Sequence, residues 1–146
     1  MTDKHILVPV DFSKGSDRAV AQAETLALAL GADVEFFHAY QLPVLALPDS
    51  SVTVSPTYVA DLTDRAQREL NKYRDGAQEH GLKATVKLLE GNPAEAIVER
   101  AEAIRATMIV LGTHGRSGFK RFLLGSTAER VVRTAEVPVL TVHLPE

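Results

Sequence analysis

TMIVLGTHGRSGFKRFLLGST, residues 107–127, contains the features that decide the fold class. It opens with an apolar run at 107–111 of the kind found in strands buried on both faces of a parallel sheet. A loop with glycines at 112, 115, 118 and 125 follows, and Ser126 with Glu129 then forms an S-x-x-E pattern that predicts a helix start. A strand, a glycine-rich loop and a helix in this order are typical of an α/β protein whose ligand lies at the carboxyl end of the strand.

The same alternation of apolar runs and amphipathic segments extends along the chain, which predicts βα units around a parallel sheet. Strands are expected at residues 6–10, 34–39, 84–89, 107–111 and 137–142. Helices are expected from a cap at Ser16, over about 57–80, from a cap at Asn92 to about Arg105, and from Ser126. Gly31 and Gly81 follow the first two helices, where glycine readily takes the left-handed conformation that ends a helix.

The composition of the strands predicts their order in the sheet. Residues 6–10 and 107–111 are the most continuous apolar runs and are expected at the centre, whereas Thr85, Lys87 and Pro138 mark the edge strands. Right-handed crossovers then give a five-stranded parallel sheet of order 3-2-1-4-5 in a three-layer α/β/α, Rossmann-like fold. The winding direction reverses between the first and fourth strands, so a ligand crevice is expected at their carboxyl ends.

Composition limits the classes of function. The 146 residues leave room for one domain, 1–146, and the 45% hydrophobic and 24% charged fractions are those of a globular protein. The chain has no cysteine and a formal net charge of −3, so we expect neither a thiolate metal site nor nucleic-acid binding. Because no apolar run could span a membrane and residues 1–5 do not open a signal peptide, we expect a cytoplasmic protein that does not bind membranes.

The glycine loop is suited to an anion. Its glycines are expected to turn the backbone through positive φ and to let a ligand approach bare N–H groups. The helix start at Ser126 would add unpaired N–H groups and a positive dipole end. Arg116, Lys120 and Arg121 lie between the glycines and would neutralise a polyphosphate. Because the Ser126 hydroxyl cannot fully serve both the Glu129 amide and a phosphate, we expect these two roles to compete.

Better-known phosphate-binding motifs do not match this loop. G-x-x-x-x-G-K-[ST] is absent, because Gly125 is followed directly by Ser126 with no lysine between them. G-x-G-x-x-G is absent too, since the first three glycines of the loop are spaced three residues apart. A response-regulator receiver would need an acidic pair after the first strand, and only Asp11 is present there.

The spacing Gly112-x2-Gly115-x9-Gly125-Ser126 occurs together with ILVPVD at 6–11, GNPAEAIVERA at 91–101 and VPVLTV at 137–142. In this combination the chain closely resembles the universal stress protein family, and its glycine pattern resembles that of the ATP-binding branch. The resemblance implies an adenine nucleotide alpha hydrolase-like fold and ATP as the ligand, with or without Mg²⁺ or Mn²⁺. It also implies homodimers that pair through the last strand, residues 137–142.

The resemblance further implies where the nucleotide binds. Adenine and ribose would lie near Pro9, Asp11 and Ala39, and the phosphates near the last glycine of the loop and the helix start. The expected nucleotide-binding residues are Pro9, Val10, Asp11, Ala39, Leu111, Gly112, Thr113, His114, Gly115, Arg116, Gly118, Gly125, Ser126 and Thr127. No residue is expected to be catalytic or to form a protein metal site.

Several interpretations stay open at this point. We expect a nucleotide-binding protein that reports a stress or energy state to a partner protein, and the alternatives are a slow Mg²⁺-dependent ATPase and a nucleotide-free interaction module. Asp11 could instead order the turn after its strand, and His38 and His114 could be packing or solvated residues. Residues 41–57 form a long apolar connection that we expect to pack near the crevice or against a partner.

Overall fold

The computed structural model describes residues 3–42, 46–47, 50–51, 55–113 and 124–144. Strands and helices alternate along most of this part of the chain, as the hydrophobic pattern predicts. In chain order the elements are β1 (His5–Pro9), α1 (Lys14–Leu30), β2 (Asp33–Tyr40), β3 (Ala46–Leu47), β4 (Ser50–Ser51), α2 (Pro56–Glu79), β5 (Ala84–Glu90), α3 (Pro93–Ala103), β6 (Met108–Gly112), α4 (Ser126–Thr134) and β7 (Val139–Val142).

The main sheet has the strand order β5-β2-β1-β6-β7, and every neighbouring pair in it is parallel. This is the order 3-2-1-4-5 predicted from the sequence, which is therefore confirmed. The central strands carry the most continuous apolar runs, with Leu7 and Ile109 paired in register and both fully buried. The direction of winding reverses between β1 and β6, so the carboxyl ends of these two strands form the topological switch point.

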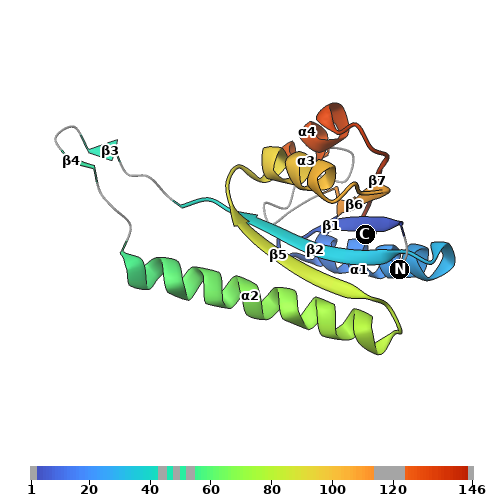
Figure 1. The fold of residues 1–146 in the computed structure, drawn as a ribbon. Coiled ribbons are helices and arrows are strands. Elements are labelled where there is room, and N and C mark those ends of the chain that lie inside the picture. Colours follow the sequence, from blue (N-terminus) through green and yellow to red (C-terminus); the bar gives the residue numbers. More distant parts are fainter. Residues whose placement is uncertain (1–2, 43–45, 48–49, 52–54, 114–123, 145–146) are drawn as a thin grey trace.

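Helices cover both faces of the sheet, with α1 and α2 on one side and α3 and α4 on the other (Figure 1). Side chains alternate along β1 between the two layers: Ile6 and Val8 belong to the cluster that includes residues of α1 and α2, and Leu7 belongs to the cluster of α3 and α4. Burial on both faces explains why the central strands read as continuous apolar runs.

A buried ion pair fixes α3 over the sheet. Glu35 of β2 has a side chain that is only 8% exposed, and the Arg100 guanidinium of α3 binds it with Nη2 to Oε1 at 2.7 Å and Nε to Oε1 at 3.0 Å. A buried carboxylate needs such a partner, because an unpaired charge inside a protein is strongly destabilising. The pair therefore holds the last turn of α3 on β2.

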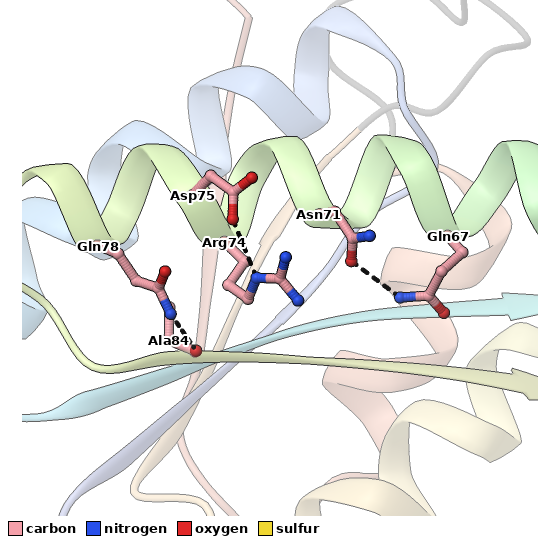
Figure 2. Close-up of polar contacts among 6 residues, drawn as sticks. All are labelled: Gln67, Asn71, Arg74, Asp75, Gln78 and Ala84. Carbon is pink, nitrogen blue, oxygen red and sulfur yellow. Dashed lines mark hydrogen bonds and ion pairs between the residues drawn. The ribbon is translucent and has the colours of Figure 1, made fainter.

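Helix α2 packs along the edge strand β5. Figure 2 shows Gln78 Nε2 donating to the carbonyl oxygen of Ala84 at 3.4 Å, which ties the last turns of α2 to the start of β5. The other contacts drawn there lie within the helix, among them Gln67 Nε2 to Asn71 Oδ1 at 3.0 Å. Polar side chains of α2 thus bond to one another and to β5, while the helix also buries Ala66, Leu70 and Ala77.

Among the signals predicted for α1, α2 and α3, three are confirmed and one is wrong. Gly31 has φ 67° at the end of α1, Gly81 has φ 88° after α2, and the side chain of Asn92 caps α3 by accepting from the Glu95 amide. Ser16 does not cap α1, which begins at Lys14 with Ser13 as its N-cap. The reason is that the Ser16 hydroxyl is already bonded to Asp11, as described below.

Replacing Asn92 by alanine is expected to lower the free energy of unfolding by about 1 kcal/mol, because the Glu95 amide would lose its acceptor. Ser55, the N-cap of α2, makes no side-chain cap hydrogen bond, so Ser55→Ala is a matched control that should stay within about 0.5 kcal/mol of the parent. Urea denaturation measures both values. Equal losses in the two variants would contradict the assigned caps.

The connection between β2 and α2 is described in part. Within it, β3 and β4 pair antiparallel, and they lie apart from the main sheet and beyond the start of α2 (Figure 1). The described part of the connection therefore does not pack at the crevice, and contact with a partner stays a prediction. None of the described helices is long and apolar enough to cross a membrane.

Candidate functional site

A cavity of about 360 Å³ lies at the carboxyl ends of β1, β2 and β6, where the sequence predicted a crevice. Its volume is in the range of small-molecule sites, roughly 300–1,000 Å³. The expected nucleotide-binding residues that line it are Pro9, Val10, Asp11, Ala39, Leu111, Gly112, Thr113, Gly125, Ser126 and Thr127. Residues far apart in the sequence thus surround one cavity.

The remaining expected residues belong to the middle of the glycine loop. His114, Gly115, Arg116 and Gly118 lie outside the described residues. Their assignment as nucleotide-binding residues therefore stays a prediction.

Part of the cavity wall was not predicted from the sequence. Ser16, Phe37, Pro93, Ile97 and Ala128 line it, and so does His38, for which the sequence left a packing role open. Phe37 and Ile97 belong to the core cluster shared by the sheet with α3 and α4, so one wall of the cavity is apolar. The only sequence signal for this wall is the start of α3 at Pro93, because helices that follow parallel strands begin at the ligand edge of the sheet.

Asp11 organises the turn between β1 and α1. Its Oδ1 accepts from the Ser13 amide at 3.0 Å and from the Ser16 hydroxyl at 2.8 Å, while its own amide donates to Ser16 Oγ at 2.8 Å. These bonds support the interpretation that Asp11 orders the turn. Since Asp11 also lines the cavity, the same network fixes the position of a carboxylate beside the ligand space.

Gly112 is a glycine for a packing reason. A Cβ atom added there would meet the carbonyl carbon and oxygen of Gly15 at 2.9 Å, so β6 and the start of α1 approach as closely as their backbones allow. The expectation of positive φ is wrong for the two described glycines of the loop: Gly112 belongs to β6 and is not among the positive-φ residues, and Gly125 has φ −60°. Close backbone contact, rather than a left-handed turn, explains Gly112.

The two described ends of the glycine loop are joined to each other. Gly125 N donates to the carbonyl of Thr113 at 2.6 Å, and Thr113 N donates to the carbonyl of Val142 at 3.1 Å. Thr113 is almost completely buried. The end of β7, the end of β6 and the start of α4 are therefore connected through main-chain hydrogen bonds directly beside the cavity.

Three helices begin at the cavity, so three positive dipole ends point toward it. Two of these starts are capped by side chains: Ser13 Oγ accepts from the Ser16 amide at the start of α1, and Asn92 Oδ1 accepts from the Glu95 amide at the start of α3, both at 3.2 Å. Helix α4 differs, because its N-cap is Gly125 and makes no side-chain hydrogen bond.

The expectation that Ser126 caps α4 is wrong. The helix begins at Ser126 as predicted, but the Glu129 amide donates to the carbonyl of Gly125 at 2.9 Å. Because the backbone satisfies this amide, the expected competition between capping and phosphate binding does not arise. In the described part of the chain no protein group accepts from the N–H groups of Ser126, Thr127 and Ala128, which all line the cavity.

The described residues contain no group of three or more His, Cys, Asp or Glu side chains that could hold a metal ion. Around the cavity, the side-chain oxygens of the expected set are the hydroxyl groups of Thr113, Ser126 and Thr127 and the Asp11 carboxylate. A divalent cation at this site would therefore depend on ligand phosphates for most of its coordination.

An open parallel sheet with helices on both faces and a cavity at its switch point defines a doubly wound α/β protein, and this switch point is where such sheets bind ligands. The model of the universal stress protein family matches residues 3–143. Universal stress protein MJ0531 of Methanocaldococcus jannaschii is 38% identical over 145 residues, which cover 98% of this chain and 84% of that protein. The chain belongs to the universal stress protein family.

Solved structures support the same fold. The structure of protein MJ0577 has a TM-score of 0.81 at 24% identity and covers 100% of this chain and 99% of that one. The crystal structure of a universal stress protein in complex with cAMP has a TM-score of 0.68 at 27% identity and covers 97% of this chain and 98% of that one. The fold is thus the one that the resemblance in the sequence implies.

Proposed function

We propose that the chain binds an adenine nucleotide, ATP in particular, in the cavity between β1 and β6, and acts as a regulatory protein rather than as an enzyme. The observation that carries this proposal is the start of α4. Its first three N–H groups line the cavity, and within the described residues none of them donates to a protein acceptor. N–H groups at a helix start bind phosphate through hydrogen bonds and the helix dipole together.

The rest of the cavity suits a nucleoside. Phe37, Ile97 and Leu111 provide an apolar wall against which a base can pack, and Asp11 provides an acceptor for a ribose hydroxyl. The solved universal stress protein with bound cAMP supports the choice of an adenine nucleotide. In the proposed arrangement the base lies toward Ala39 and the phosphates lie along the start of α4, with the cationic residues of the glycine loop nearby.

The direct test is to identify and then titrate the ligand. Mass spectrometry of the supernatant from freshly purified, denatured protein should detect ATP or another adenine nucleotide. Calorimetry of the stripped protein should then give tighter binding for ATP than for AMP, because the additional phosphates reach the α4 amides. Protein that purifies without nucleotide and gives no heat with ATP would favour a nucleotide-free interaction module.

We also propose that the chain forms homodimers through residues 137–142. β7 pairs with β6 along one side only, so its other side is an open edge, and Leu140 remains exposed on it. The carbonyl of Pro138 accepts from Ile109 of β6, and that of Val142 accepts from Thr113 directly after β6. Alternation along the strand therefore directs the N–H and C=O groups of Val139 and Thr141 toward the open edge.

Replacing Thr141 by proline should convert the dimer to a monomer with little loss of fold, because proline removes an N–H from the open edge and leaves the β6 ladder intact. Light scattering gives the mass, and circular dichroism reports the fold. Thr141→Ser keeps the N–H group at this position and is the control. It should remain dimeric. A dimeric Thr141→Pro protein would contradict pairing through β7.

A further inference from the structure

Phe12, next to Asp11 in the turn between β1 and α1, has φ 65°. Among the described residues one other non-glycine residue has positive φ, Arg105 with φ 53°. Arg105 directly follows the C-cap of α3, Ile104, where a left-handed residue is common. Phe12 does not follow a helix, so this reason does not apply to it. A bulky side chain in this region is strained, and such strain persists only where the surroundings impose it.

The surroundings that hold Phe12 are aromatic. Its ring centroid lies 4.6 Å from that of His38 and 6.5 Å from that of Tyr73, to which it is nearly parallel. Tyr73 is itself held by Phe36 at 5.7 Å and by the hydrogen bond from its hydroxyl to Asp17 Oδ1 at 2.6 Å. Phe12 is thus wedged between β2 and α2.

Burial and the neighbouring Asp17 carboxylate raise the pKa of Tyr73 well above its usual value. The phenol therefore keeps its proton, and the hydroxyl keeps donating to Asp17, throughout the physiological pH range. The contact of Tyr73 with Asp17 therefore does not change with pH in that range.

The residues around Phe12 also form hydrogen bonds to Val10 and Asp11. His38 Nδ1 lies 2.7 Å from the Val10 carbonyl oxygen, so this ring nitrogen donates to it. On the other side of Phe12 in the chain, Ser13 N donates to Asp11 Oδ1 and closes the turn around it. Val10 and Asp11 both line the cavity, whereas Phe12 does not.

We infer that Phe12 is a positioning residue for the nucleoside end of the ligand. Its side chain, held by His38 and Tyr73, keeps the turn in one conformation, so that Val10 and Asp11 are already in place when the ligand binds. Binding then orders less of the protein, and affinity is higher than with a turn that must be ordered by the ligand. This inference rests on the proposed function, because it assumes that a nucleotide occupies the cavity.

The test compares two ligands in the stripped protein, ATP and inorganic tripolyphosphate. Glycine accepts φ 65° without strain, so Phe12→Gly should fold but lose the wedge. We expect ATP to bind about ten-fold more weakly, the effect of losing one preorganised element, while tripolyphosphate affinity stays unchanged because its contacts are at α4. Tyr73→Ala, which leaves the turn sequence intact, should show the same pattern.

Arg105→Gly is the matched control, since it relieves the same kind of strain at the opposite end of the strands and should alter neither affinity. Unchanged ATP affinity in Phe12→Gly and Tyr73→Ala would overturn the inference. An equal loss of affinity for ATP and for tripolyphosphate would also overturn it, because the substitutions would then have disturbed the whole cavity and not the nucleoside end alone. Parent protein that binds tripolyphosphate but not ATP would overturn the inference and the nucleoside part of the proposed function together. If the parent protein binds ATP and the two variants bind it with the same affinity, only the inference about Phe12 is overturned, and the proposed function stands.

Discussion

A Gly112→Val variant should lose about 3 kcal/mol or more of its free energy of unfolding, because overpacking against a rigid partner is among the most destabilising changes in a protein interior. The first added atom would lie 2.9 Å from the carbonyl carbon and oxygen of Gly15. The backbone of Gly112 belongs to the central strand β6, and the backbone of Gly15 belongs to the first turn of α1. Neither backbone can move away without separating β6 from α1. Urea denaturation measures the loss.

Gly76 provides the matched control for this variant. It lies inside α2, and a Cβ added there would meet nothing within 4 Å. Gly76→Ala should therefore raise stability by about 0.5–1 kcal/mol, since glycine is a poor helix former. A Gly112→Val protein as stable as the parent would show that β6 and α1 are not in backbone contact, and the geometry of the cavity floor would then be wrong.

Replacing Ser126 by proline should weaken ATP binding by roughly 10- to 100-fold while the fold is retained, because hydrogen bonds to charged groups contribute about 1.5–3 kcal/mol each. Ser126 is the first residue of α4, a position where proline is favoured, since its missing N–H has no partner within the helix. Gly125 has φ −60° and ψ 158°, which is the extended conformation that a residue before proline requires. The variant thus removes a phosphate donor and leaves the helix able to form.

The serine hydroxyl is removed by the same change, so Ser126→Ala is the necessary comparison. It deletes the hydroxyl and keeps the amide, and most of the affinity should remain. Calorimetry with ATP measures both variants, and circular dichroism shows whether α4 is retained. If Ser126→Pro bound ATP as tightly as Ser126→Ala did, the amide would not be a phosphate contact.

The order of the sheet could be predicted from the sequence because burial and composition agree strand by strand. The runs at 6–10 and 107–111 are apolar since they lie between two helix layers, and the polar residues Thr85 and Lys87 mark β5 as an edge. The expected positions around the cavity follow from this order, because the carboxyl ends of parallel strands meet at one edge.

Of the three helix caps at the cavity, only Asn92 of α3 could be predicted from the local pattern. Ser13 and Ser16 are both plausible caps of α1, and only the bonds between Ser16 and Asp11 decide that Ser13 takes the role. The S-x-x-E pattern at Ser126 likewise gave the correct helix start and the wrong cap, because the Gly125 carbonyl accepts from the Glu129 amide.

Other parts of the site depend on tertiary contacts. Ile97 reaches the cavity because Arg100, one turn further along α3, is anchored to Glu35 on a different strand. The strained conformation of Phe12 is equally invisible in the sequence, since its ring is held by residues of β2 and α2. Contacts between distant segments, rather than local propensity, determine both features.

The most direct test of the account is an amide NMR titration of the stripped, isotope-labelled protein with ATP and, separately, with adenosine. The amide signals of Ser126, Thr127 and Ala128 should shift strongly with ATP and hardly at all with adenosine, whereas signals near Asp11 should respond to both. If the three α4 amides did not respond to ATP while other residues of the cavity did, phosphate binding at the start of α4 would be contradicted.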